Sequence, residues 1–199
     1  CAVDSTALNL SNTNLWRKTK WKTGPIYRGW IKIHALVDVD TNEIIAVIVT
    51  TDKMGDNTAF TMLTDLAFDK GHKISTIYAD SAYEAKSNWK DSEAKKYTLV
   101  VKFKKNCNGK CNGSFARGKA AKEYLDMSYD EWRATTKYGR RWKAESSFSD
   151  FKRLISEHIA SVSDQGIIKE TAAKILGYNF FKATRAKMVH RTSNGVIVS

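Results

Sequence analysis

Hydrophobic and polar positions along the chain predict strands and helices that follow one another. Two β-branched runs, residues 30–37 and 44–51, flank a turn-rich segment and predict a β-hairpin. Further strands are expected over residues 74–80, which end in an aspartate, and over residues 97–103. The short apolar segment before Asp4 is interpreted as the end of another strand, which delivers that side chain.

Helices are expected in four further segments. Apolar residues near helical spacing predict a helix over residues 58–70 and one long helix over residues 128–156, and residues 84–96 are interpreted as a polar helix. Residues 103–127 are basic and rich in glycine, which favours a flexible insert. A final amphipathic helix is expected over residues 164–189, with an inward side of Ile167, Ile168, Ala172, Ile175, Leu176, Phe180 and Phe181. This order predicts a mixed sheet with helices packed on it.

Length and charge narrow the class of protein. The 199 residues suffice for one domain, residues 1–199, with a substantial core. A net charge of +12 indicates a polyanionic partner, above all nucleic acid. No stretch approaches the roughly 20 apolar residues of a spanning helix, and no signal peptide is evident, so a membrane is not expected. Cys107 and Cys111 lack further zinc ligands and are interpreted as reduced thiols in a polar loop.

One predicted helix carries a distinctive polar stripe. At roughly 100° per residue, Tyr138, Arg141, Glu145 and Lys152 fall within about 60° of one another. A carboxylate among positive side chains and a phenol suits a metal-bound acid beside a phosphate backbone. The alternative is a solvated face with ordinary ion pairs, including one between Arg141 and Glu145.

Two upstream aspartates strengthen the metal interpretation. Asp4 and Asp80 both adjoin predicted strands, and Ser81 can cap the helix that follows. Either aspartate alone is typical of the end of an element. With Glu145 they form an oxygen-only set of the kind that hard divalent ions prefer.

Two basic segments are candidates for DNA contact. Arg17, Lys18 and Lys20 interleave with tryptophans in a predicted loop, an arrangement that can stack on exposed bases and bind phosphates. Lys104 and Lys105 belong to the basic insert. The alternatives are a tryptophan of the core in the first segment and a solvated loop in the second.

These residues resemble the catalytic domain of a DDE-type insertion-sequence transposase from a prokaryote. One large group of that family has Tyr, two residues, Arg, three residues, Glu, six residues and Lys, and every gap matches here. Asp4 in Val-Asp-Ser-Thr resembles the family's first aspartate, and Asp80 in Ala-Asp-Ser-Ala-Tyr its second. Many relatives carry a His-Asp pair where this chain has Gly-Asp-Asn around Asp56, which leaves the role of Asp56 open.

The resemblance implies a ribonuclease-H-like α/β fold, with a five-stranded mixed sheet flanked by helices and its first and fourth strands as neighbours. It implies two Mg²⁺ ions, replaceable by Mn²⁺, with Asp4 bridging them and Asp80 and Glu145 binding one each. Arg141 and Lys152 would hold the DNA strand. Tyr138 either donates a hydrogen bond to phosphate or packs at the start of its helix.

The implied activity is cleavage at transposon ends followed by transfer of the 3′-hydroxyl into target DNA. The expected partners are double-stranded DNA and a second copy of the chain, as a homodimer that synapses two ends. The expected location is the prokaryotic cytoplasm, at the nucleoid. A DNA-recognition region upstream of the first residue is expected to be missing. The alternatives are a nuclease of the same fold without strand transfer and an inactive DNA-binding remnant.

Overall fold

The fold is built on a mixed β-sheet. The computed structural model describes residues 1–11, 29–50 and 54–193, with side chains as far as residue 185. The strands lie in the spatial order β3-β2-β1-β4-β5, and the short β6 pairs with the far end of β1. β1, β2 and β3 are antiparallel neighbours, whereas β4 and β5 run parallel to β1. Their bounds are β1 (Ala2–Leu10), β2 (Trp30–Val37), β3 (Ile44–Thr50), β4 (Thr76–Ala79), β5 (Thr98–Val101) and β6 (His158–Ile159).

This strand order confirms the ribonuclease-H-like expectation, including the first and fourth strands as neighbours. The sheet has six strands rather than five, because the chain after helix α6 (Trp142–Ile155) pairs briefly with the far end of β1. The interpretation that a strand ends at Asp4 is wrong, since β1 continues to Leu10 and Asp4 lies near its beginning. Buried Leu8 and Leu10 alternate with exposed neighbours, as expected of a strand with one covered face.

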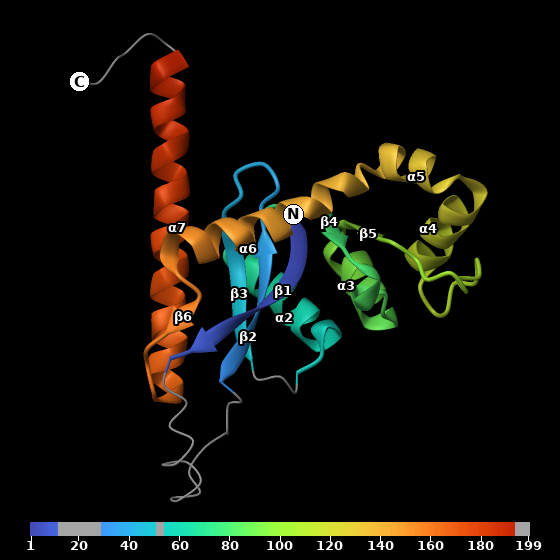
Figure 1. Cartoon of the computed structure of the whole chain (residues 1–199). Coiled ribbons are helices and arrows are strands. Elements are labelled where there is room, and N and C mark those ends of the chain that lie inside the picture. Colours follow the sequence, from blue (N-terminus) through green and yellow to red (C-terminus); the bar gives the residue numbers. More distant parts are fainter. Residues whose placement is uncertain (12–28, 51–53, 194–199) are drawn as a thin grey trace, which may run out of the picture.

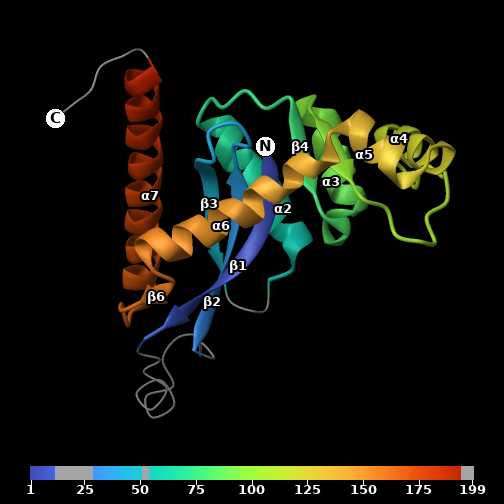
Figure 2. The ribbon, with the colours of Figure 1, turned by 45° about the horizontal axis from the view of Figure 1, so that its top comes forward.

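Helices cover both faces of the sheet (Figures 1 and 2). Each face has its own hydrophobic core. On one face α2 (Asp56–Asp69) packs on residues that include Val3 and Ile77. On the other face α6 and α7 (Asp164–Ser193) pack on a second set, which includes Ala2 and Tyr78. The two sets come from adjacent positions because successive side chains of a strand point to opposite faces.

The predicted helices are confirmed in part. The segments 58–70 and 84–96 form α2 and α3 (Lys86–Lys95). The single helix expected over residues 128–156 is wrong, because the chain forms α5 (Tyr129–Thr136), the 3₁₀ turn η2 (Tyr138–Arg141) and then α6. Lys137 separates α5 from η2 with a left-handed φ of 56°, a conformation that no α-helix interior accommodates.

The basic insert is also more ordered than the sequence predicted. Residues 103–127 contain α4 (Phe115–Asp126), so a flexible loop throughout is wrong. The hydroxyl of Ser114 accepts a hydrogen bond from the Arg117 backbone and caps the helix. The Arg117 guanidinium donates to Glu84 at 2.7 and 2.9 Å, which ties α4 to the chain before α3.

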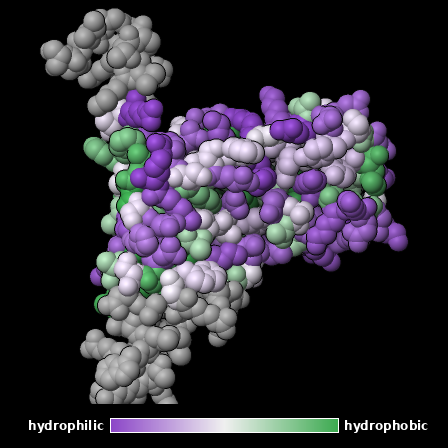
Figure 3. Space-filling model, viewed as in Figure 1, coloured by the Kyte–Doolittle hydropathy of each residue, from purple (hydrophilic) through white to green (hydrophobic). Residues whose placement is uncertain are grey.

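Helix α7 presents apolar residues on two sides. Ile167 and Ile175 are buried as predicted. The inward assignment is wrong for Ile168, Leu176, Phe180 and Phe181, which are 41–75% exposed, and for Ala172, which is also exposed. Figure 3 shows hydrophobic surface along α7 and near α4, while most of that face is hydrophilic. Among the described residues, no helix combines the length and apolar character needed to cross a bilayer.

Candidate active site

Asp4 and Asp80 lie on adjacent parallel strands near the centre of the sheet. Ala2 of β1 stands opposite Tyr78 of β4, so the register two residues further on brings Asp4 opposite Asp80. The backbone at Asp80 is still extended, with φ −81° and ψ 178°, so the alternation of side chains continues past the end of β4. Both aspartates therefore share the sheet face of Ala2 and Tyr78, which α6 covers.

Glu145 reaches the same region from α6. Ala144 and Phe148 are buried in the core beneath this helix and hold it against the sheet. Glu145 lies in the first turn, with its side chain 40% exposed, and its carboxylate accepts a hydrogen bond from the Arg141 guanidinium. The ion pair considered from the sequence is thus present in the structure.

The three carboxylates act on one another electrostatically. The pKa of Asp4 is raised above its ordinary value, chiefly because burial disfavours the charged form. The Ser5 backbone N–H, which donates to Asp4 at 2.8 Å, and the Arg141 cation both lower this pKa. The negative charges of Asp80 and Glu145 raise it further, so all of these groups lie within electrostatic reach of Asp4.

Tyr138 is anchored to the strand that leads to Asp80. Its buried hydroxyl donates a hydrogen bond to the Ala79 carbonyl at 3.1 Å. Burial, opposed by Arg141 and reinforced by Asp80, raises the pKa of Tyr138 to about 12, so the phenol remains a donor at neutral pH. This geometry favours the packing role over the phosphate contact, which stays a prediction.

Lys152 lies on α6 beyond Glu145. At 1.5 Å per residue, seven residues of helix separate the two Cα atoms by about 10 Å. The ammonium lies 3.3 Å from the Glu157 carboxylate, and Glu157 also accepts a hydrogen bond from Asn9 at the far end of β1. Lys152 is thus placed along the helix from the carboxylates rather than among them.

The other predicted DNA contacts divide into two groups. Lys104 and Lys105 are exposed just after β5. Because β5 runs parallel to β4, these lysines lie beyond the same ends of the strands as Asp80, the carboxyl ends. Arg17, Lys18 and Lys20 lie outside the described residues.

Asp56 belongs to a separate polar cluster. Its carboxylate lies 2.7 Å from the Lys32 ammonium and 3.2 Å from Nδ1 of the fully buried His34. The other ring nitrogen of His34 lies 3.1 Å from the Thr50 hydroxyl. Burial lowers the pKa of His34, with Lys32 acting in the same direction and Asp56 against it, so this imidazole is neutral at pH 7. Asp56 thus pairs with Lys32 at the start of α2.

The candidate site has suitable donors for a hard divalent cation but does not yet arrange them as ligands. Glu145 is held by Arg141, and one oxygen each of Asp4 and Asp80 accepts a backbone N–H, at 2.8 and 2.7 Å. Across the described ranges, no three Asp, Glu, His or Cys side chains are close enough to share an ion. The oxygen-only set fits Mg²⁺ chemically.

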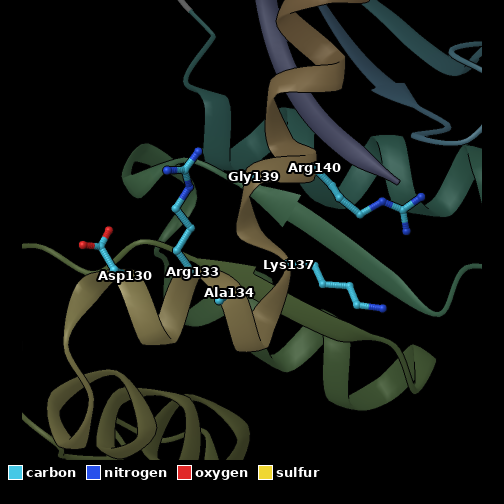
Figure 4. A pocket seen from close by; sticks show the side chains of 6 residues that line it. All are labelled: Asp130, Arg133, Ala134, Lys137, Gly139 and Arg140. Atoms are coloured by element: carbon cyan, nitrogen blue, oxygen red, sulfur yellow. The ribbon is translucent and has the colours of Figure 1, made fainter.

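A basic pocket beside the site was missed by the sequence analysis. It measures about 500 Å³ and lies between α5 and η2 (Figure 4), lined by Asp130, Arg133, Ala134, Lys137, Gly139 and Arg140. The sequence feature that could have indicated it is the presence of Lys137 and Arg140 three residues apart. On the single long helix that was predicted, two such cations did not stand out from the other basic residues.

Comparison with known families agrees with this geometry. The model of the family described as "Transposase DDE domain" matches residues 1–180 of the chain. The matched region contains Asp4, Asp80 and Glu145, together with all six strands of the sheet. With most of its length matched and its strands in the ribonuclease-H-like order, this chain belongs to the transposase DDE domain family.

Proposed function

We propose that this chain cuts DNA at transposon ends by metal-assisted hydrolysis and joins the freed 3′-hydroxyl to target DNA. Family membership supports a transposase or nuclease function. The observation that carries the finer assignment is the register that sets Asp4 opposite Asp80 on the face covered by the Glu145 helix. A nuclease or transferase of this chemistry needs three such carboxylates at one place.

Asp4, Asp80 and Glu145 would hold two Mg²⁺ ions, or Mn²⁺ in their place, with Asp4 in the bridging position. Bound there, the ions supply activation of the attacking oxygen and neutralisation of the leaving oxygen. The protein contributes the negative charge that retains them. Burial and the neighbouring carboxylates raise the pKa of Asp4. At a given pH, a larger fraction of Asp4 is therefore protonated than of an isolated aspartate, and a cation that binds there must displace this proton.

Arg141 and Lys152 would hold the scissile strand. Arg141 now binds Glu145, and its planar guanidinium suits two phosphate oxygens once Glu145 turns toward a cation. The Glu157 partner of Lys152 is more than one-third exposed, and surface ion pairs contribute about 0–1 kcal/mol, so a phosphate can replace it.

We extend the proposal to the partners. Double-stranded DNA of the transposon ends and of the target would lie over the carboxylates, with Lys104 and Lys105 along the sheet edge. The whole chain, residues 1–199, would act as a single catalytic domain in a homodimer that synapses two ends. It would work in the prokaryotic cytoplasm, at the nucleoid.

Nicking of end-sequence DNA in Mg²⁺ or Mn²⁺ tests the assignment. Glu145→Gln is expected to abolish nicking, whereas Glu123→Gln is expected to leave it unchanged. Glu123 is a matched control because it also follows a basic residue, Lys119, at i+4, but on the exposed face of α4. Equal nicking by the Glu145→Gln variant and the parent refutes the assignment.

The reaction products separate the remaining alternatives. Joined DNA supports strand transfer, and cleavage without joining supports a nuclease of the same fold. Metal binding without turnover on any DNA supports an inactive remnant. The assay uses a labelled donor duplex and an unlabelled target, so that joined strands are longer than the donor.

A further inference from the structure

Side chains at the turn η2 extend in two directions. A 3₁₀ helix has three residues per turn, so residues i and i+3 share a face. Tyr138 and Arg141 share the face toward the carboxylates, where they contact Ala79 and Glu145. Lys137 precedes the turn in the left-handed conformation, and Figure 4 shows its side chain and that of Arg140 extending in one direction from the ribbon.

The basic pocket lies between α5 and η2. Its lining contains three cations, Arg133, Lys137 and Arg140, and a single carboxylate, Asp130. In Figure 4 the side chains of Asp130 and Arg133 lie on the α5 side, whereas those of Lys137 and Arg140 extend on the other side of η2. Within the part of the chain that the structure describes, neither Arg133 nor Lys137 forms an ion pair. Arg140 pairs only with Asp40, which is 75% exposed, so this contact contributes little to stability.

The pocket and the candidate active site share the turn η2. Arg140 and Arg141 are adjacent in sequence, and Tyr138 fixes the same turn to the residue before Asp80. The two guanidinium groups extend from different sides of this turn, toward Asp40 and toward Glu145, so a strand that crosses the turn would meet both. Arg and Lys side chains are the groups that bind the phosphates of a nucleic-acid backbone.

We propose that Lys137 and Arg140 bind backbone phosphates of the DNA where it leaves the catalytic carboxylates. This inference rests on the proposed function, since it assigns a second contact to the same substrate. The contact is independent of base sequence, because only phosphate oxygens are recognised. It holds the strand in line with the site and does not take part in bond cleavage.

Salt-dependent DNA binding tests Lys137 against a matched control. Lys137 and Lys96 each follow a helix in the left-handed conformation, with φ of 56° and 61°, where glycine is well tolerated. Lys96 is exposed before β5, at the sheet edge opposite to Asp80. Lys137→Gly and Lys96→Gly therefore make the same change of charge and backbone freedom at two places. Thermal unfolding of both variants verifies that they are folded.

The probe is a fluorescein-labelled duplex of random sequence, bound by the full chain in EDTA and followed by anisotropy. Loss of one phosphate contact makes the negative slope of log K against log salt shallower by about 0.9. For two proteins of equal affinity at 1 M salt, this change corresponds to about eightfold weaker binding at 0.1 M salt. This change is expected for Lys137→Gly and not for Lys96→Gly. Equal slopes for the two variants overturn the proposal.

Arg140 needs a different control because of its ion pair. Arg140→Gln and Asp40→Asn both break the contact between the two side chains, but only the first removes a cation. A phosphate-binding role predicts a shallower salt slope for Arg140→Gln alone. Shallower slopes for both variants indicate a structural pair and overturn the assignment of Arg140. These measurements use no divalent ion, so their outcome is separate from that of the Glu145→Gln nicking assay.

Discussion

The hydroxyl of Tyr138 provides a quantitative test of how the site is held together. It donates to the Ala79 carbonyl at 3.1 Å, and both residues are buried. Tyr138→Phe removes the donor and leaves that carbonyl without its partner. An unpaired buried polar group costs about 1–3 kcal/mol. For a chain of about 200 residues, 1 kcal/mol shifts the melting temperature by about 2–4 °C, so Tyr138→Phe is expected to melt several degrees lower.

Differential scanning calorimetry at neutral pH measures this shift, and Tyr129→Phe is the control. Tyr129 is 42% exposed and stacks on Trp132, so loss of its hydroxyl leaves no buried group unpaired. Its melting temperature should match that of the parent. An unchanged melting temperature for Tyr138→Phe, together with weaker DNA binding, would refute the anchoring role and make Tyr138 a phosphate contact instead.

Three further outcomes follow from the same contacts. Asp4→Asn should raise the melting temperature at pH 7 while abolishing nicking. The raised pKa of Asp4 means that the folded state binds its proton more tightly, so its contribution to stability falls as pH rises from the ordinary value of 3.8 through the folded pKa. The gain should disappear at lower pH, and a lower melting temperature at pH 7 would contradict this reasoning. Duplex DNA should tighten Mn²⁺ binding to the parent, in calorimetric titrations, by drawing Arg141 away from Glu145. Arg141→Ala should bind Mn²⁺ with the same affinity with and without DNA, and a persistent gain would exclude this coupling. Gly118→Ala should destabilise the chain in urea by about 1–3 kcal/mol, because the new Cβ would lie 2.4 Å from the Cys111 sulfur. Adding Cys111→Ala should recover part of this loss. If Gly118→Ala alone is as stable as the parent, the loop that contains Cys111 moves without cost and this reasoning is wrong.

The central part of the fold could be predicted because local patterns and long-range pairing agree there. The β-branched runs on either side of the 38–43 turn fix a hairpin, which the structure places at β2 and β3. No pattern in the sequence around Asp4 or Asp80 indicates that the two side chains lie next to each other. Their adjacency was implied by the family resemblance, and the parallel register of β1 and β4 provides its physical basis.

The errors fall where distant contacts override local composition. Glycines and lysines between residues 103 and 127 favour a loop, yet the buried ion pair of Arg117 with Glu84 fixes α4 from another part of the chain. Likewise, helical periodicity alone extended one helix through Lys137. The hydrogen bond from Tyr138 to Ala79 belongs to the separate 3₁₀ turn that follows, and no spacing within residues 128–156 encodes it.

The contact between Arg141 and Glu145 explains why one spacing supports two interpretations of the sequence. Residues four apart on a helical segment face each other, so their side chains form an ion pair when no ligand is present. The same separation brings a guanidinium beside the carboxylate that would hold a cation, which is where a phosphate bound to that cation would lie. In this arrangement Arg141 offsets part of the repulsion among Asp4, Asp80 and Glu145. A cation and a phosphate would together replace both halves of this ion pair. The ion-pair interpretation and the catalytic interpretation therefore describe two arrangements of the same residues, and the structure shows the ion pair.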